Sequence, residues 1–319
     1  MSRVQSWWLV LPLLALALAG CMRWRYSDRD LARVFNKRRL PLAIHHVRAA
    51  GADVRYVEVR SGEPGEPDKP NILFIHGAPS SLKVWAGYLT DPALAKVANL
   101  YALDRPGYGH SEFGHADTSL LHQAQVCESI MRRHPGRWIV FGSSYGGPIA
   151  SVVTARNVDK VKALLLTSPA IAPGHEKTYD ISYMIMKPAF GWMFPVIFKV
   201  ASAEKLSHYN QLCSIEALYP QITQPVTYIH GGQDGLIYPV NATYAKAVFS
   251  NAHLKMITLP HRPHFFTFTE QGLITRELVA LLDYARPPRS RLEEARREEA
   301  ADSSRTGERL PFRPLPPQK

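Results

Sequence analysis

A glycine-flanked serine constrains the fold of this chain more than any other feature. Residues 138–141 form a short apolar run of the kind found in buried strands, and residues 149–155 are apolar at helical spacing. Between the two lie Gly142, Ser144 and Gly146, in the pattern Gly-x-Ser-x-Gly. This order predicts a strand, a sharp turn and a helix, with the serine at the top of the turn.

The two glycines have a mechanical reason. In a strained strand-to-helix turn, the residues two positions before and after the serine pack against its backbone, so a Cβ atom there would clash. Ser144 meets this requirement, whereas Ser143 lies two residues from Phe141 and Tyr145. The following helix points its positive end toward the Ser144 hydroxyl. Alone, the pattern also fits a simple turn that caps a helix, so a nucleophilic serine needs support from elsewhere in the chain.

A second glycine turn, with the sequence His-Gly-Ala-Pro, follows the apolar run 71–75. Such a turn leaves the backbone N–H of Ala78 free to point toward the serine, beside the N–H of Tyr145. Two backbone donors aimed at one point form an oxyanion hole, which stabilises developing negative charge. The alternative is an ordinary strand-to-helix turn with no chemical role.

Charged and polar residues follow two later apolar runs, 225–230 and 254–259, which we interpret as strands. Asp234 lies just past the first, where the edge of a parallel sheet carries its active groups. His261 and His264 lie just past the second.

The rest of the chain alternates between strand and helix patterns, which favours a mostly parallel, doubly wound sheet. The predicted elements are strands at 43–48, 54–60, 98–103 and 161–166, with helices at 120–134 and 268–284. The first two strands are expected to form a hairpin around Gly51. Asp104 is expected to brace the glycine-rich loop that follows residue 103, and His110 to be a loop residue.

Between about residues 170 and 224 the alternation stops and a proline-broken apolar stretch begins. It is crowded with large apolar side chains, namely Tyr179, Tyr183, Met184, Met186, Phe190, Trp192, Met193, Phe194 and Phe198. One interpretation is a helical excursion that packs its own core. Another, compatible with the first, is a lid over an apolar pocket. The pocket residues that we predict are Trp85, Tyr183, Phe190 and Trp192.

Composition indicates a folded chain with a basic start. Of 319 residues, 46% are hydrophobic, which is enough for one large domain or two small ones. The net charge of +11 gathers partly near the N-terminus, at Arg23, Arg25, Arg29, Arg33, Lys37, Arg38 and Arg39. We interpret 22–41 as a basic tether or short helix, either solvated or held against anionic lipid head groups. Without metal-ligand spacing, a nucleic-acid motif or a phosphate loop, we expect no metal, organic cofactor or nucleic-acid partner.

Residues 1–21 have the features of a targeting segment. Arg3 precedes an apolar core from Trp7 to Ala19, which is too short to span a bilayer, and the segment ends in Leu-Ala-Gly-Cys. This end resembles a bacterial lipobox, in which Cys21 receives the lipid. With Met22 next, the resemblance implies a lipid anchor in the outer membrane, facing the periplasm. An ordinary signal peptide or a short membrane anchor is the alternative.

The remaining parts of the chain carry no predicted chemistry. Cys127 and Cys213 suggest no disulfide framework and are expected to be buried thiols. Residues 286–319 are rich in proline, arginine and glutamate, and are expected to form a disordered tail.

Together, five motifs resemble the α/β-hydrolase fold family. They are His-Gly-x-Pro at 76–79, Asp-x-x-Gly-x-Gly-x-Ser at 104–111, Gly-x-Ser-x-Gly at 142–146, Gly-x-x-Asp at 231–234 and the late His264. The resemblance covers about residues 43–284. It implies an α/β-hydrolase core at 42–169 and 225–285, with a small helical lid, 170–224, inserted after the sixth strand.

By this resemblance, Ser144 is the nucleophile, Asp234 the acid and His264 the base of a catalytic triad. Pro263 stands where relatives usually have glycine, which keeps His261 open as the base. A serine in place of an aspartate nucleophile argues against the epoxide hydrolase and haloalkane dehalogenase branches.

The function that we expect is hydrolysis of hydrophobic carboxylic esters through an acyl-enzyme on Ser144, as in carboxylesterases and small lipases. Carbon–carbon bond hydrolysis or perhydrolysis on the same triad is an alternative. A non-catalytic envelope lipoprotein that binds a partner is another. The sequence leaves the oligomeric state open.

Overall fold

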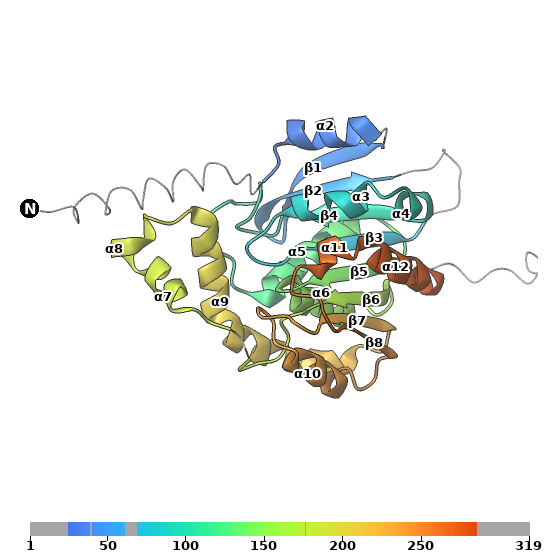
Figure 1. Cartoon of the computed structure of the whole chain (residues 1–319). Coiled ribbons are helices and arrows are strands. Elements are labelled where there is room, and N and C mark those ends of the chain that lie inside the picture. The colour runs from blue at the N-terminus through green and yellow to red at the C-terminus, as the bar shows by residue number, and fades with distance from the viewer. Residues whose placement is uncertain (1–24, 39, 61–68, 176, 286–319) are drawn as a thin grey trace, which may run out of the picture. The chain divides into compact units, whose positions relative to one another are not determined.

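The computed structural model describes residues 25–38, 40–60, 69–175 and 177–285. The predicted targeting segment with Cys21 and the predicted tail, 286–319, lie outside the described residues. Within the described part, eight strands form one sheet flanked by helices on both faces (Figure 1). The predicted α/β-hydrolase fold class is confirmed.

The sheet has the order β1-β2-β4-β3-β5-β6-β7-β8. Its strands are β1 (Leu42–Ala49), β2 (Ala52–Val59), β3 (Asn71–Ile75), β4 (Asn99–Leu103), β5 (Trp138–Ser143), β6 (Val161–Thr167), β7 (Val226–Gly231) and β8 (Leu254–Leu259). Only the β1–β2 and β2–β4 pairs are antiparallel. The carboxyl ends of β3 to β8 therefore meet at one edge, where an α/β sheet places its site.

Most helices cover the two faces of this sheet. They are α2 (Asp28–Arg38), α3 (Ala86–Leu89), α4 (Pro92–Val97), α5 (Leu120–Arg133), α6 (Gly146–Arg156), α10 (Val240–Val248), α11 (Phe266–Thr269) and α12 (Gln271–Ala285). Helices α5, α6 and α10 pack on one face, and α2, α3, α4 and α12 on the other. Along β3, Ile72 and Phe74 point to the second group of helices, and Leu73 and Ile75 to the first. Both faces are buried, so the strand reads as a continuous apolar run.

The basic stretch after residue 24 contains more structure than a tether. Helix α2 places Leu31 and Phe35 in the core with no exposed surface. Its Asp28 forms an ion pair with the buried Arg55 at 2.9 Å. The helix thus holds the start of the described chain against the sheet.

A cap follows β6. It contains α7 (Asp180–Met186), α8 (Pro188–Gly191) and α9 (Val196–Ile215), with the short helical turn η2 (Glu216–Gln221) leading back to β7. Figure 1 shows the cap helices in yellow, beside the end of the sheet. Among the described residues, no helix combines the length and the apolar character needed to cross a bilayer.

The two described cysteines differ from each other. Cys127 is buried in α5, as predicted, but Cys213 is exposed, so the prediction of a buried thiol is wrong there. Cys213 lies one residue beyond the buried Leu212 on α9. Successive residues of a helix point about 100° apart, so a single-position difference moves a side chain from the core to the surface.

Candidate active site

The glycine-flanked serine lies on the sharp turn that the sequence predicts. Strand β5 ends at Ser143, helix α6 begins at Gly146, and Ser144 between them has a φ angle of +54°. A Cβ atom on Gly142 would approach the carbonyl oxygen of Gly146 to 2.5 Å, which the backbone cannot accommodate. The Ser144 N–H donates to the carbonyl of Thr167 at 3.0 Å, which ties the strained turn to β6.

Asp234 and His264 lie in contact. The Nδ1 atom of His264 is 2.7 Å from Oδ2 of Asp234. The other oxygen of Asp234 accepts hydrogen bonds from the N–H groups of Leu236 and Ile237, at 2.9 and 2.8 Å. The carboxylate is held by three donors, so both its position and the tautomer of the imidazole are fixed.

The electrostatics of Asp234 favour a charged carboxylate. Burial by itself would raise the pKa of Asp234, but the hydrogen bond and charge of His264 and the N–H of Ile237 act against it. The net result is a pKa below the ordinary value. Asp234 is therefore ionised at neutral pH and able to balance a positive charge on His264.

Ser144 and His264 line the same cavity, which has a volume of about 420 Å³. The side chain of His264 is mostly buried, and its Nδ1 is occupied by Asp234, which leaves Nε2 for the cavity side. The structure thus brings the three predicted residues to one edge of the sheet. The rival His261 is exposed and lines neither this cavity nor the smaller one beside it.

The two predicted oxyanion donors also border the cavity. Ala78 and Tyr145 line it together with Ser144. Neither backbone N–H donates a hydrogen bond to another described residue. The turn at residues 76–79 approaches Ser144 so closely that a Cβ atom on Gly77 would lie 2.9 Å from Cβ of Ser144. Glycine at this position permits the approach. Two unpaired donors beside a nucleophile are what an oxyanion hole requires.

The wall of the cavity facing the cap is largely apolar. Tyr179, Ile181, Ile185 and Phe198 line it from the cap, and Phe265 lines it beside His264. Such a lining suits an apolar group of a substrate better than a charged one.

The predicted pocket residues differ from this lining. Trp85 lines only the smaller cavity of about 60 Å³ near Ser144. Tyr183, Phe190 and Trp192 are 55%, 44% and 73% exposed and line neither cavity. Apolar residues occur on both faces of α7 and α8, so the sequence did not reveal which face points inward.

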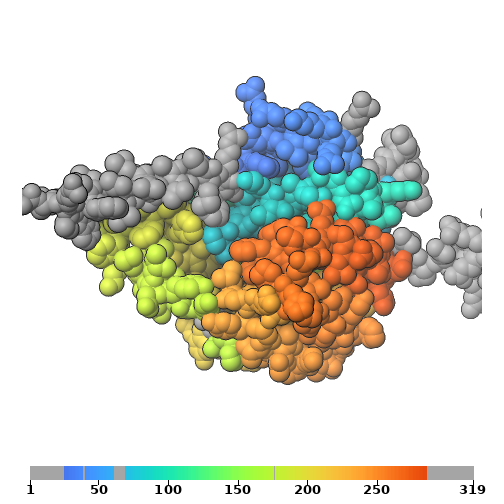
Figure 2. Space-filling view, viewed as in Figure 1, coloured from blue at the N-terminus to red at the C-terminus, as the bar shows by residue number. Residues whose placement is uncertain are grey.

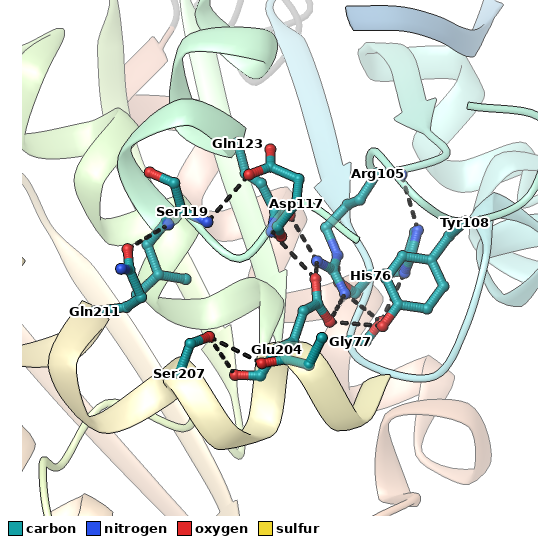
Figure 3. Close-up of polar contacts among 12 residues, drawn as sticks. His76, Gly77, Arg105, Tyr108, Asp117, Ser119, Gln123, Glu204, Ser207 and Gln211 are labelled. Carbon is teal, nitrogen blue, oxygen red and sulfur yellow. Dashed lines mark hydrogen bonds and ion pairs between the residues drawn. The ribbon is translucent and has the colours of Figure 1, made fainter. Parts of the chain in front are cut away.

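A buried ion pair that was not predicted from the sequence joins the cap to the site. The Nη1 atom of Arg105 lies 2.6 Å from Oε1 of Glu204 on α9 (Figure 3). Both side chains are almost fully buried. Tyr108 and Gln123 also hydrogen-bond to the Glu204 carboxylate, at 2.6 and 3.1 Å. The pKa of Arg105 is raised despite its burial, because the charge of Glu204 outweighs the loss of water.

The same arginine holds the turn that contains Ala78, one of the two predicted oxyanion donors. Its Nε donates to the carbonyl of His76 at 2.8 Å, and its Nη2 to the carbonyl of Gly77 at 3.0 Å. Its guanidinium also lies over the ring of Tyr145, 4.9 Å from the centroid. Arg105 therefore contacts both segments that supply the unpaired N–H donors. One feature of the sequence could have pointed to Arg105. It is a charged residue that closely follows a buried apolar strand, in the sequence Asp-Arg-Pro-Gly.

His76 is part of this arrangement. Burial, and then the charge of Arg105, lower the pKa of His76 well below its ordinary value. Its Nε2 accepts the backbone N–H of Arg105 at 3.0 Å, so the proton of the neutral ring is on Nδ1, which donates to Gly77 O at 2.7 Å. His76 is thus a structural histidine of the turn.

Asp104 has the bracing role that its position suggests. Its carboxylate accepts hydrogen bonds from the guanidinium of Arg55 and from the backbone N–H groups of Leu82 and His110. No group of three potential metal ligands occurs within the described ranges.

Comparisons with known proteins agree with this architecture. A family model described as alpha/beta hydrolase fold matches residues 70–193. The chain is 27% identical over 183 residues to the alpha/beta hydrolase domain-containing protein WAV2 of Arabidopsis thaliana, a match that covers 54% of this chain and only 56% of that protein. It is 25% identical over 243 residues to the pimeloyl-[acyl-carrier protein] methyl ester esterase of Nitrosomonas europaea, covering 63% of this chain and 92% of the esterase.

Among solved structures, one similar chain is a membrane phospholipase A described as a bacterial virulence factor. The TM-score is 0.59 at 21% identity, and the superposition covers 88% of this chain and 98% of the phospholipase. The chain has the α/β-hydrolase fold. The family match and the relatives support its membership of the α/β-hydrolase family. They also support the assignment of the chain as a hydrolytic enzyme.

Proposed function

We propose that this chain is a serine hydrolase of hydrophobic carboxylic esters, with Ser144, Asp234 and His264 as its triad. The observation that carries the proposal is the 2.7 Å contact between Asp234 and His264 at the wall of a cavity that also holds Ser144. The ester class is supported by the apolar side chains that line the cavity from the cap and by the similarity to an esterase and a phospholipase.

The reaction begins when Ser144 Oγ attacks the ester carbonyl carbon while its proton moves to Nε2 of His264. The carbonyl oxygen becomes an oxyanion, which accepts hydrogen bonds from the N–H groups of Ala78 and Tyr145. Asp234 stabilises the imidazolium through Nδ1. The carbon–oxygen bond to the alcohol then breaks, and His264 returns the proton to the leaving alcohol.

Water completes the cycle by the same steps. His264 removes a proton from the water, whose oxygen attacks the acyl carbon, and the second tetrahedral oxyanion forms in the same place. Collapse of this intermediate breaks the bond to Ser144 Oγ, which takes the proton back from His264. The products are a carboxylic acid and a regenerated serine.

A fluorophosphonate probe tests the nucleophile, and p-nitrophenyl esters of graded acyl length test the reaction. We expect one equivalent of label on Ser144, no label in Ser144→Ala, and turnover that rises with acyl length until the cavity is filled. Labelling without turnover of any ester would shift the assignment to another reaction of the same triad. Failure to label folded protein would overturn the serine hydrolase itself.

We also propose that Cys21 carries a lipid anchor in a bacterial envelope, in the outer membrane facing the periplasm. The support is the sequence Leu-Ala-Gly-Cys after an apolar core. Labelled palmitate should enter the wild-type chain and not Cys21→Ser. Equal labelling of both would refute the anchor.

A further inference from the structure

The outer surface of the cap gathers apolar side chains. Nine of the fifteen exposed large hydrophobic side chains in the described residues lie between positions 179 and 196. They are Tyr179, Ile181, Tyr183, Met184, Met186, Phe190, Trp192, Met193 and Val196, which we call the cap patch. Figure 2 shows part of the cap surface in yellow-green. Single exposed apolar residues are ordinary, but a concentrated set marks a surface that meets something other than water.

Helix α7 leaves most of its large apolar side chains outside the core. Its buried residues are Ser182 and Ile185, which line the cavity. Tyr183, Met184 and Met186 of the same helix are exposed and do not line the cavity. Burial of apolar surface is favourable by about 25 cal/mol per Å². A partner that covers the exposed face of α7 would therefore gain binding free energy.

The charges around the patch are mostly positive. From residue 177 to 205, the described basic residues are Lys177, Lys187, Lys199 and Lys205, and the described acidic residues are Asp180 and Glu204. Glu204 is buried against Arg105 and Lys205 lines the cavity, so the charges at the border of the patch are three lysines and Asp180. Exposed aromatic and aliphatic side chains with a basic border complement an anionic lipid surface. Trp192, at 73% exposure, is the residue type that favours the level of lipid head groups.

The patch also borders the opening of the cavity that holds Ser144. Tyr179 and Ile181 belong to the patch and line that cavity. Phe265, beside His264, lines it as well and is 60% exposed. An apolar surface that continues into an apolar cavity gives a lipid-soluble substrate a path that avoids water.

We propose that the cap patch docks on an anionic lipid bilayer, so that the cavity opens at the membrane surface. This contact is separate from the proposed lipid anchor, because it is made by the folded cap. It is also independent of the triad, because binding can be measured without turnover.

Vesicle flotation tests the proposal with the mature chain from residue 21, carrying Cys21→Ser to remove the anchor. The vesicles are phosphatidylcholine alone, or phosphatidylcholine with phosphatidylglycerol. We expect the protein to float with the anionic vesicles and to bind neutral ones more weakly. Phe190→Ser/Trp192→Ser should weaken binding by at least about tenfold, since it removes two aromatic anchors. Lys187→Glu should reduce the preference for phosphatidylglycerol.

Tyr284→Ser is the matched control, because Tyr284 is an aromatic side chain of 53% exposure on α12, outside the patch. It should bind vesicles like the parent chain, and all variants should keep the parent melting temperature. Brominated lipids should quench the parent fluorescence and quench Trp192→Phe less.

Three results would overturn the proposal. The first is a parent chain that remains unbound with phosphatidylglycerol vesicles. The second is binding that the double variant and the control retain equally. The third is a lipid-free dimer that the double variant abolishes, since the patch would then be a contact between two copies of the chain.

Discussion

Arg105 Nη1 lies 2.6 Å from Glu204 Oε1, and this contact ties helix α9 of the cap to the loop after β4. The same guanidinium donates to the carbonyls of His76 and Gly77, which precede the proposed oxyanion donor Ala78. The position of the cap and the shape of the proposed oxyanion hole therefore depend on one buried ion pair.

Glu204→Gln should lower both stability and turnover. Arg105 would then be a buried charge without its partner, which should lower the free energy of unfolding by about 3–5 kcal/mol. The turn that Arg105 holds should also shift, and this shift should lower kcat more than it raises KM. The matched control is Glu277→Gln, which breaks the 2.7 Å ion pair with Lys255, whose side chain is 54% exposed. That change should cost at most about 1 kcal/mol. Denaturant unfolding and ester kinetics measure both effects, and equal costs for the two variants would contradict the prediction.

Asp234→Asn should leave the fold intact and reduce kcat by about 10⁴-fold, because an amide cannot hold the imidazole tautomer or balance its charge. KM should change little, since Asp234 lies behind His264 and away from the bound ester. His261→Gln is the control, because His261 is exposed and should not alter the rate. If His261→Gln were as slow as Asp234→Asn, the assignment of His264 as the base would fail.

Gly77→Ala tests the close approach of the first turn to the nucleophile. A Cβ atom there would lie 2.9 Å from Cβ of Ser144 and 3.2 Å from the carbonyl oxygen of Ser143, so one of the two segments must move. A shift of this kind at the reacting atoms should lower kcat by about 100-fold or more. Gly235→Ala is the control, because nothing lies within 4 Å of a Cβ atom at that position. Parent-like turnover in Gly77→Ala would mean that the turn relaxes without cost.

The sequence predicted the sheet and the convergence of Ser144, Asp234 and His264 because backbone features set both. Glycines mark the turn, and apolar runs mark strands whose ends share an edge. The Arg105–Glu204 pair could not be predicted, because the residues are 99 positions apart and charged residues are ordinarily solvated. The inward and outward faces of α7 could not be predicted for a different reason. A seven-residue helix with apolar residues all round has no periodic signal to orient it.

His208 should make the fold less stable in acid. Burial lowers its pKa from 6.5 to about 4, and its Nε2 donates to the carbonyl of Ala170 at 3.0 Å. Between these two pH values the unfolded chain binds a proton that the folded chain excludes, so stability falls as the pH falls from 6.5 toward 4. His208→Gln keeps an amide donor for Ala170 and removes the titration.

Denaturant unfolding from about pH 7 to about pH 4 measures the difference between the two proteins. Between neutral pH and about pH 4, the free energy of unfolding of the parent chain should fall by up to about 3 kcal/mol more than that of His208→Gln. The other buried histidines, His76 and His230, also have lowered pKa values, but they titrate in both proteins and cancel in the comparison. Two curves that stay parallel over this range would show that His208 is already protonated in the fold or still neutral in the unfolded chain.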